Sequence, residues 1–239
     1  VIPVVMSFLI SVVLSPIVIP FLKRLKIGQT VREEGVQSHK VKNGTPTMGG
    51  VIILLGIVAA TMPYLEKSPG CIPVLFVTIG FGIIGFLDDY IKVVMRRSEG
   101  LTPLQKLGGQ MVVTTVFVYY LMNHTLVDIT RLMLPFTHGQ ELVLPMWLAV
   151  VLLYFAVIGT VNGVNFTDGL DGLAASVTML VAVFFSVSAV GMKSGIEPVT
   201  CAAVGSLLGF LLFNVHPAKV FMGDTGSLAL GGFVAATAY

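Results

Sequence analysis

The stretch CIPVLFVTIGFGIIGFL, residues 71–87, contains no charged residue and runs directly into Asp88 and Asp89. A run of about 20 apolar residues is long enough to cross the hydrocarbon of a bilayer as a helix. In that medium each backbone N–H and C=O group must be paired within the protein, and a helix achieves this. The stretch therefore predicts a membrane-spanning helix that ends at a pair of acidic side chains.

The rest of the chain has the same character. Of its 239 residues 55% are hydrophobic and 11% are charged, whereas a soluble domain carries roughly 25% charged residues. Apolar blocks lie at about 1–22, 49–65, 71–87, 104–122, 146–164, 173–190, 199–213 and 227–239. We therefore predict an all-α fold, a polytopic transmembrane helix bundle with about eight spans, in a single transmembrane domain over residues 1–239.

The ends of the chain and one loop need separate interpretations. The first block lacks a preceding basic region and a clear cleavage site, which favours a span over a signal peptide. The last block is too short to complete a crossing comfortably, so we expect the C-terminal spans to be missing from this chain. Alternation around residues 141–144 predicts a small β-hairpin. Cys71 and Cys201 are too few for a disulfide framework.

Charge is distributed unevenly between the loops, and the net charge of +2 does not indicate a nucleic-acid partner. If the spans alternate in direction, the loops of one membrane face are 23–48, 88–103, 165–172 and 214–226, with Lys106 beside them. All but three of the 14 lysines and arginines belong to this face, the exceptions being Lys67, Arg131 and Lys193. The positive-inside rule predicts that this face is cytoplasmic.

The aspartates divide in the same way. All except Asp128 belong to the basic face and lie close to span ends: Asp88, Asp89, Asp168, Asp171 and Asp224. Acids beside a membrane are costly to keep ionised unless a cation offsets them. Acids from three separate loops on one face therefore indicate a shared site.

The first acidic loop follows residue 87. Two adjacent carboxylates repel each other, which suits one of Asp88 and Asp89 to act as a base. Lys92 lies four residues after Asp88, on the same helical face. The alternative interpretation is an ordinary ion pair at a solvated helix end.

The second acidic loop is NFTDGLDG, residues 165–172. The spacing of three places Asp168 and Asp171 on one helical face, and the adjacent glycines let a ligand approach the backbone. The alternative is that Thr167 or Asp168 is simply the N-cap of the next span.

The third acidic loop runs from Asn214 to Gly226. Asp224, between Gly223 and Thr225, suits Mg²⁺, which takes one or two carboxylates plus phosphate oxygens. Phe221 is suited to stack on a flat base. The alternative is a tight loop whose proline and glycines are turn residues.

A basic, glycine-containing loop, residues 39–50, leads into the second block. Lysines such as Lys40 near a helix N-terminus make an anion site, although such lysines also serve simply to fix topology. Acids for Mg²⁺ and for a base, lysines for phosphates and an aromatic ring for a nucleobase would then share one face. This combination suits transfer of a phosphoryl group from a soluble nucleotide onto a lipid.

Five strings together closely resemble the bacterial phospho-N-acetylmuramoyl-pentapeptide transferases, within the polyprenyl-phosphate N-acetylhexosamine-1-phosphate transferase superfamily. They are HKVKNGTPTMGG (39–50), GFLDDYIKV (85–93), GLTPLQKLGGQ (100–110), NGVNFTDGLDGLA (162–174) and NVHPAKVFMGDTGSLALGG (214–232). The resemblance covers essentially the whole chain, and five strings in the same order are highly specific.

The resemblance implies ten spans in a full-length member, a homodimer, and a Mg²⁺-dependent site on the cytoplasmic face of the bacterial inner membrane. It implies transfer of phospho-MurNAc-pentapeptide from UDP-MurNAc-pentapeptide to undecaprenyl phosphate, giving lipid I and UMP for peptidoglycan. The family also has a histidine-rich loop and further spans after the eighth, which these residues do not include.

Site residues carried over by the resemblance fall into three groups. The catalytic candidates are Asp88, Asp89, Lys92 and Asp224, of which Asp224 is also the metal ligand. The uridine and nucleoside-inhibitor region is matched by Asn165, Asp168, Asp171 and Phe221, with Asn214 and Gly223 in the same loops. The first cytoplasmic loop contributes Lys40 and Thr45.

Three other functions compete with this reading. A sister transferase would use UDP-N-acetylglucosamine as its donor. An intramembrane aspartyl protease would pair Asp88 with Asp224 and need neither Mg²⁺ nor a nucleotide. A transporter would place its acids along a central path, whereas here they lie in loops on one face.

Overall fold

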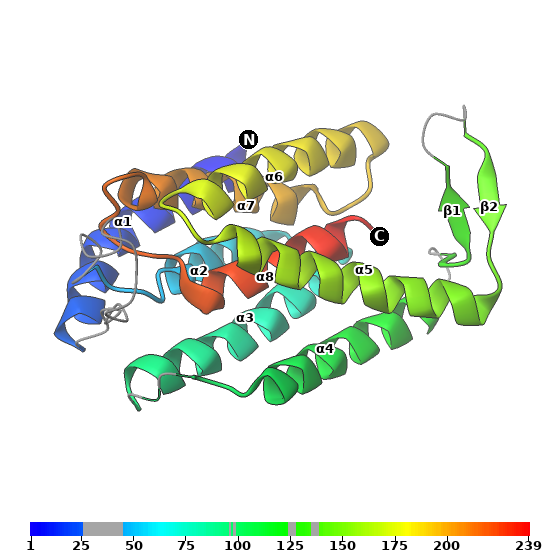
Figure 1. The fold of residues 1–239 in the computed structure, drawn as a ribbon. Coiled ribbons are helices and arrows are strands. Elements are labelled where there is room, and N and C mark those ends of the chain that lie inside the picture. The colour runs from blue at the N-terminus through cyan, green and yellow to red at the C-terminus, as the bar shows by residue number, and fades with distance from the viewer. Residues whose placement is uncertain (26–44, 96, 98, 124–127, 135–138) are drawn as a thin grey trace.

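The computed structural model describes residues 1–239 except 26–44, 96, 98, 124–127 and 135–138. Its helices are α1 (Ile2–Arg24), α2 (Gly50–Thr61), the 3₁₀ turn η2 (Met62–Tyr64), α3 (Cys71–Val93), α4 (Pro103–Asn123), α5 (Met146–Thr167), α6 (Leu173–Met192), α7 (Glu197–Asn214) and α8 (Gly223–Thr237). Each apolar block has become a helix, so the prediction of an all-α bundle is confirmed (Figure 1).

Within the described residues, five helices are long and apolar enough to cross a membrane: α1, α3, α5, α6 and α7. The other three fall short for different reasons. Helix α2 and its 3₁₀ turn are short, α8 has 15 residues, and α4 is interrupted by polar side chains such as Lys106 and Gln110. A helix that packs mainly on other helices is not required to match the bilayer thickness, and most of α8 is buried.

Helix α8 lies inside the bundle, packed most closely on α3 and flanked by α5 and α2 (Figure 1). Two glycines allow this approach. A Cβ at Gly85 would lie 2.0 Å from the carbonyl oxygen of Asp224, and one at Gly50 would lie 2.1 Å from the nitrogen of Gly226. Small residues let helix backbones approach closely in membrane proteins. The start of α8 is therefore held against the C-terminal half of α3.

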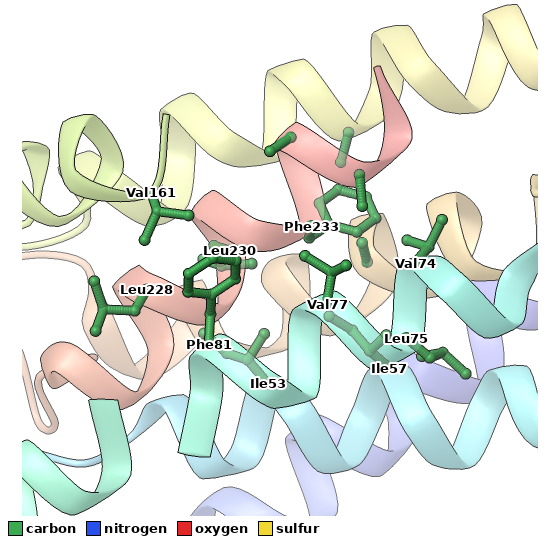
Figure 2. Packing of buried hydrophobic residues seen from close by; sticks show 14 of the residues in the cluster. Ile53, Ile57, Val74, Leu75, Val77, Phe81, Val161, Leu228, Leu230 and Phe233 are labelled. Atoms are coloured by element: carbon green, nitrogen blue, oxygen red, sulfur yellow. The ribbon is translucent and has the colours of Figure 1, made fainter. Parts of the chain in front are cut away.

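The buried apolar core takes residues from all eight α-helices, and its part between α2, α3, α5 and α8 is labelled in Figure 2. Phe81 of α3 and Phe233 of α8 are fully buried, and Ile53 and Val161 pack beside them. On the other side of α2, Ser11 of α1 and Ser206 of α7 share a hydrogen bond of 2.9 Å. Dispersion and buried hydrogen bonds of this kind replace the hydrophobic effect as the driving force between helices in lipid.

The β-hairpin predicted around residues 141–144 is confirmed. Strands β1 (Arg131–Met133) and β2 (Glu141–Val143) pair antiparallel, with Leu132 opposite Leu142. Arg131 joins them through an ion pair with Glu141 at 3.1 Å. The hairpin projects at the opposite end of the bundle from the first turn of α8 (Figure 1). The predicted acidic site and the hairpin therefore belong to different ends.

Candidate active site

Asp224 lies in the first turn of α8, where α3, α4 and α5 approach it. Its Oδ2 accepts hydrogen bonds from Nζ of Lys92 at 3.0 Å and from Nζ of Lys106 at 2.8 Å. Its Oδ1 accepts one from Nδ2 of Asn165 at 2.9 Å. Three helices therefore each place one donor on the same carboxylate.

Asp88 shares the two lysines of Asp224. Nζ of Lys92 lies 2.5 Å from Oδ2 of Asp88, so the prediction that the two residues share a helical face is confirmed. The alternative of an ordinary ion pair at a solvated helix end does not fit, because Asp88 is only 1% exposed. Nζ of Lys106 lies 3.8 Å from the same oxygen. Because two carboxylates face two ammonium groups, the charges of this group balance. Charge pairs that are shielded from water interact more strongly than exposed ones.

The chain covers Asp88 from the solvent side. Its side chain is only 1% exposed, and its Oδ1 accepts a hydrogen bond from the backbone nitrogen of Leu101 at 2.9 Å. Gly100 has φ +62°, and a Cβ there would lie 2.7 Å from Oδ1 of Asp88. The Gly100–Leu101 segment thus packs directly against this carboxylate.

Asp89 has the contacts of a helix cap. Its Oδ1 accepts from the backbone nitrogen of Asp224 at 3.2 Å, and its Oδ2 accepts from the backbone nitrogen of Thr225 at 2.9 Å. The hydroxyl of Thr225 also donates to Oδ2, at 2.7 Å. A carboxylate satisfies the free N–H groups of a helix N-terminus and complements its dipole. Asp89 therefore fixes the position and direction of the turn that carries Asp224.

A pocket of about 320 Å³ opens beside these groups. Its size is at the lower end of the range for small-molecule sites. It is lined by Thr47, Asp89, Lys92, Val93, Asn165, Asp168, Gly169, Leu170, Asn214, Phe221, Gly223 and Asp224. Most of the residues proposed from the sequence therefore gather around one cavity, although they come from separate loops.

Other candidates lie beside the pocket or outside the described residues. Oδ2 of Asp171 accepts from the backbone nitrogen of Ala218 at 3.2 Å and lies 3.0 Å from Nδ1 of His216. Oγ1 of Thr45 donates to the carbonyl of Ala218 at 3.4 Å. Both side chains thus support the loop before α8. Lys40 lies outside the described residues.

The expectation that Asp168 and Asp171 share a helical face is wrong. Helix α5 ends at Thr167 and α6 begins at Leu173, so both acids lie in the turn between them. The predicted N-cap role for Thr167 or Asp168 is also wrong, because the N-cap of α6 is Gly172 with φ +75°. Within this turn Asp168 lines the pocket, whereas Asp171 contacts the 216–218 loop.

Lys106 was missed as a site residue. It was predicted only as a member of the basic face, although its contact with Asp224, at 2.8 Å, is shorter than those of Lys92 and Asn165. The signal that could have identified it is its position at the start of a helix on the basic face, beside the aspartates, within the string GLTPLQK. Ser227 was also missed; its hydroxyl accepts a hydrogen bond from Asn165 at 2.8 Å.

The donor set fits Mg²⁺ that is bound together with a phosphorylated substrate. No three His, Cys, Asp or Glu side chains form a metal site in the part of the chain that the structure describes. Asp224, at the pocket, and Asp88, behind it, supply the kind of one or two carboxylates that Mg²⁺ uses when phosphate oxygens complete its shell. Lys92 and Lys106 form ion pairs with Asp224 at 3.0 and 2.8 Å.

Comparison with known proteins identifies the family. The profile of glycosyl transferase family 4 matches residues 71–239, and signature 1 of the phospho-N-acetylmuramoyl-pentapeptide-transferases matches residues 42–54. The chain belongs to the family of the phospho-N-acetylmuramoyl-pentapeptide-transferases. The resemblance seen in the five sequence strings is thereby confirmed.

Individual relatives agree along nearly the whole chain. It is 52% identical to the phospho-N-acetylmuramoyl-pentapeptide-transferase of Bacillus licheniformis over 237 residues, which are 97% of this chain and 72% of the relative. The transferase of Bacillus subtilis is 49% identical, with the same coverage. That of Geobacillus thermodenitrificans is 50% identical over 100% of this chain and 74% of its own length. The site residues thus lie in the part that the chain shares with these transferases.

Proposed function

We propose that this chain transfers phospho-MurNAc-pentapeptide from UDP-MurNAc-pentapeptide to undecaprenyl phosphate, giving lipid I and UMP in peptidoglycan biosynthesis. Family membership supports the reaction class and the donor. The observation that carries the proposal is the convergence of Lys92 and Lys106 on Asp224 at the pocket. Two ammonium groups beside a carboxylate suit a diphosphate that must be bound and then cleaved.

The donor nucleotide would occupy the pocket. Phe221, which lines the pocket, would stack on the uracil ring, and the polar side chains of Asp168 and Asn214 line the same pocket. The diphosphate would then lie toward Lys92 and Lys106, where the positive charge is. Lys40 and Thr45 stay predictions as further donor contacts, because neither belongs to the described pocket wall.

Magnesium ion is the cofactor we propose, held by Asp224 with Asp88 nearby. When bound there, it supplies positive charge to the diphosphate as the bond to UMP breaks. Asn165 would keep Oδ1 of Asp224 oriented, while the lysines at Oδ2 would turn to the phosphate oxygens.

In the proposed reaction an oxygen of undecaprenyl phosphate attacks the sugar-linked phosphorus, and the bond from that phosphorus to UMP breaks. Asp88 takes the proton of undecaprenyl phosphate. For this contact the Gly100–Leu101 segment must move away, because it covers Asp88. The alternative route has two steps, with an aspartate as the nucleophile, and a trapped phospho-aspartate would establish it.

Two observations support the proposed placement in the membrane. The exposed side of α1 is apolar, with Val5, Leu9 and Val13 each at least half exposed, as expected for a face in contact with lipid. We propose that the site lies on the cytoplasmic face of the bacterial inner membrane; the basic loops support this face under the positive-inside rule, and the family resemblance supports this membrane. We also propose a homodimer, on the grounds of the family resemblance.

The test is UMP release by the full-length protein in detergent with undecaprenyl phosphate. UDP-MurNAc-pentapeptide and UDP-N-acetylglucosamine are supplied in parallel, each with and without Mg²⁺. We expect Mg²⁺-dependent release from the muramoyl donor alone. Release from the other donor alone would assign the protein to the sister transferases. Release from neither would contradict the proposed activity.

A further inference from the structure

Helices α4 and α5 are joined by a reciprocal pair of side-chain amides. Nδ2 of Asn162 donates to Oε1 of Gln110 at 2.9 Å, and Nε2 of Gln110 donates to Oδ1 of Asn162 at 3.3 Å. Nδ2 of Asn162 also donates to the carbonyl of Ile158 at 2.8 Å. Gln110 is only 1% exposed, so each amide is the principal polar partner available to the other.

This amide pair lies directly behind the two residues that bind Asp224 from opposite sides. Gln110 follows Lys106 by four residues on α4, and Asn162 precedes Asn165 by three on α5. Either spacing is close to one helical turn, a rise of about 5 Å. Residues at these spacings share a helical face. The separation of α4 and α5 at the amide pair is thus passed on to Lys106 and Asn165.

Asp224 depends on that separation. Lys106 binds its Oδ2 and Asn165 binds its Oδ1, so the carboxylate is bracketed by α4 and α5. The lysine chain is long and flexible, and it could follow several positions of α4. A pair of short planar amides with two mutual hydrogen bonds fixes one distance. Unpaired amides buried in a membrane bundle are unfavourable, which disfavours other separations.

The position of the amide pair distinguishes it from a hydrogen bond that only holds two helices together. A second hydrogen bond joins the same helices farther from the site, from Oη of Tyr154 to Oγ1 of Thr115 at 2.8 Å, and it is exposed. Neither Gln110 nor Asn162 lines the pocket. They are therefore suited to act on the reaction through Lys106 and Asn165 rather than by touching the substrate.

We propose that Gln110 and Asn162 are positioning residues whose amide pair sets the spacing of α4 and α5, and so holds Lys106 and Asn165 on the two oxygens of Asp224. The proposal rests on the proposed transferase function for its effect on rate. Displacement of a reacting group by about 1 Å can cost on the order of 100-fold in rate. Losing the amide pair should lower kcat while leaving KM for the nucleotide donor nearly unchanged.

Two readouts test the proposal in the full-length protein. The variants are Gln110→Leu, Asn162→Leu and the exchange of both residues, Gln110→Asn with Asn162→Gln, which keeps two facing amides. Tyr154→Phe is the matched control on the same helix pair. The first readout is steady-state UMP release. The second is the rate at which an amine-acylating reagent modifies Lys106, measured by mass spectrometry with the exposed-loop Lys67 as internal reference.

We expect each leucine variant to lower kcat by about tenfold and to speed acylation of Lys106, which is 19% exposed in its ion pairs. Tyr154→Phe should change neither kcat nor the acylation rate. The double variant Gln110→Asn with Asn162→Gln should bring both quantities part of the way back to their wild-type values. Unchanged kcat and acylation in both leucine variants would overturn the proposal, and so would equal effects in Tyr154→Phe. If the wild-type protein released no UMP, the transferase function would fail, whereas the acylation rates would still decide the role of the amide pair.

Discussion

Lys106 and Asp224 are 118 residues apart in the chain, and Nζ of Lys106 donates to Oδ2 of Asp224 at 2.8 Å. The contact joins the first turn of α4 to the first turn of α8. It makes Lys106 part of the same charge group as Asp88, Lys92 and Asp224. Mutation of any member leaves an uncompensated charge at the site, which is the basis of the first prediction.

Replacing Lys106 by methionine should lower UMP release strongly. The change keeps an unbranched side chain but removes one of two cations near the proposed diphosphate, and loss of one such stabilising group costs about 100-fold in kcat. Lys67→Met is the matched control, because Lys67 lies in the loop between η2 and α3 and does not belong to the charge group. Equal rates in Lys106→Met and wild type would remove Lys106 from the site.

Asp89→Asn should reduce stability as well as activity. The amide retains one acceptor but loses the second, so either the backbone nitrogen of Asp224 or the two donors of Thr225 go unpaired. Loss of a helix cap costs about 1 kcal/mol, which lowers the melting temperature by roughly 2–4 °C in a chain of this size. Thermal unfolding in detergent measures this. A purely catalytic Asp89 would instead lose activity at an unchanged melting temperature.

Gly100→Ala should disturb the cover of Asp88. The left-handed conformation costs a non-glycine residue about 1–2 kcal/mol, and the new Cβ would lie 2.7 Å from Oδ1 of Asp88. We expect lower activity, measured as UMP release. Gly108→Ala in α4 is the control, because a Cβ there would have no atom within 4 Å. If the two variants behaved alike, the Gly100–Leu101 segment would have no special role.

Asp224→Asn should weaken the binding of the Mg²⁺ that activity requires. The change removes the negative charge that we propose as the metal ligand, so a higher Mg²⁺ concentration should be needed for half-maximal rate. A magnesium titration of the residual activity gives the result. A titration curve that matched that of the wild-type protein would contradict the assignment of Asp224 as the Mg²⁺ ligand.

Sequence reasoning predicted the fold class and the place of the acids because both depend on local chemistry. Long apolar blocks must be helices in a bilayer, and the alternation of spans assigns each loop to a face. Asp88 and Lys92 were correctly placed on one helical face because the spacing within a single helix decides it. The gathering of Asn165, Asp168, Phe221 and Asp224 around one pocket confirms that the acidic loops of one face approach each other.

The finer assignments depended on contacts between helices. The capping contacts of Asp89 require α8 to begin against α3, which the close approach at Gly85 allows. The different contacts of Asp168 and Asp171 require α5 to end at Thr167, which puts both acids in the turn before α6. No spacing within a single segment carries this information. The tertiary approach of distant segments decides it.

The order in which the helices are synthesised determines when each contact of the charge group can form. Asp88 has Lys92 one turn away as soon as α3 has formed, so the first acid enters the membrane already partnered. The short bond from Lys106 must wait until Asp224 has been synthesised, when α8 packs between α3 and α5. This charge group is therefore complete only after α8 has been synthesised, and a nascent chain that stalls before α8 holds the lysines without their second acid.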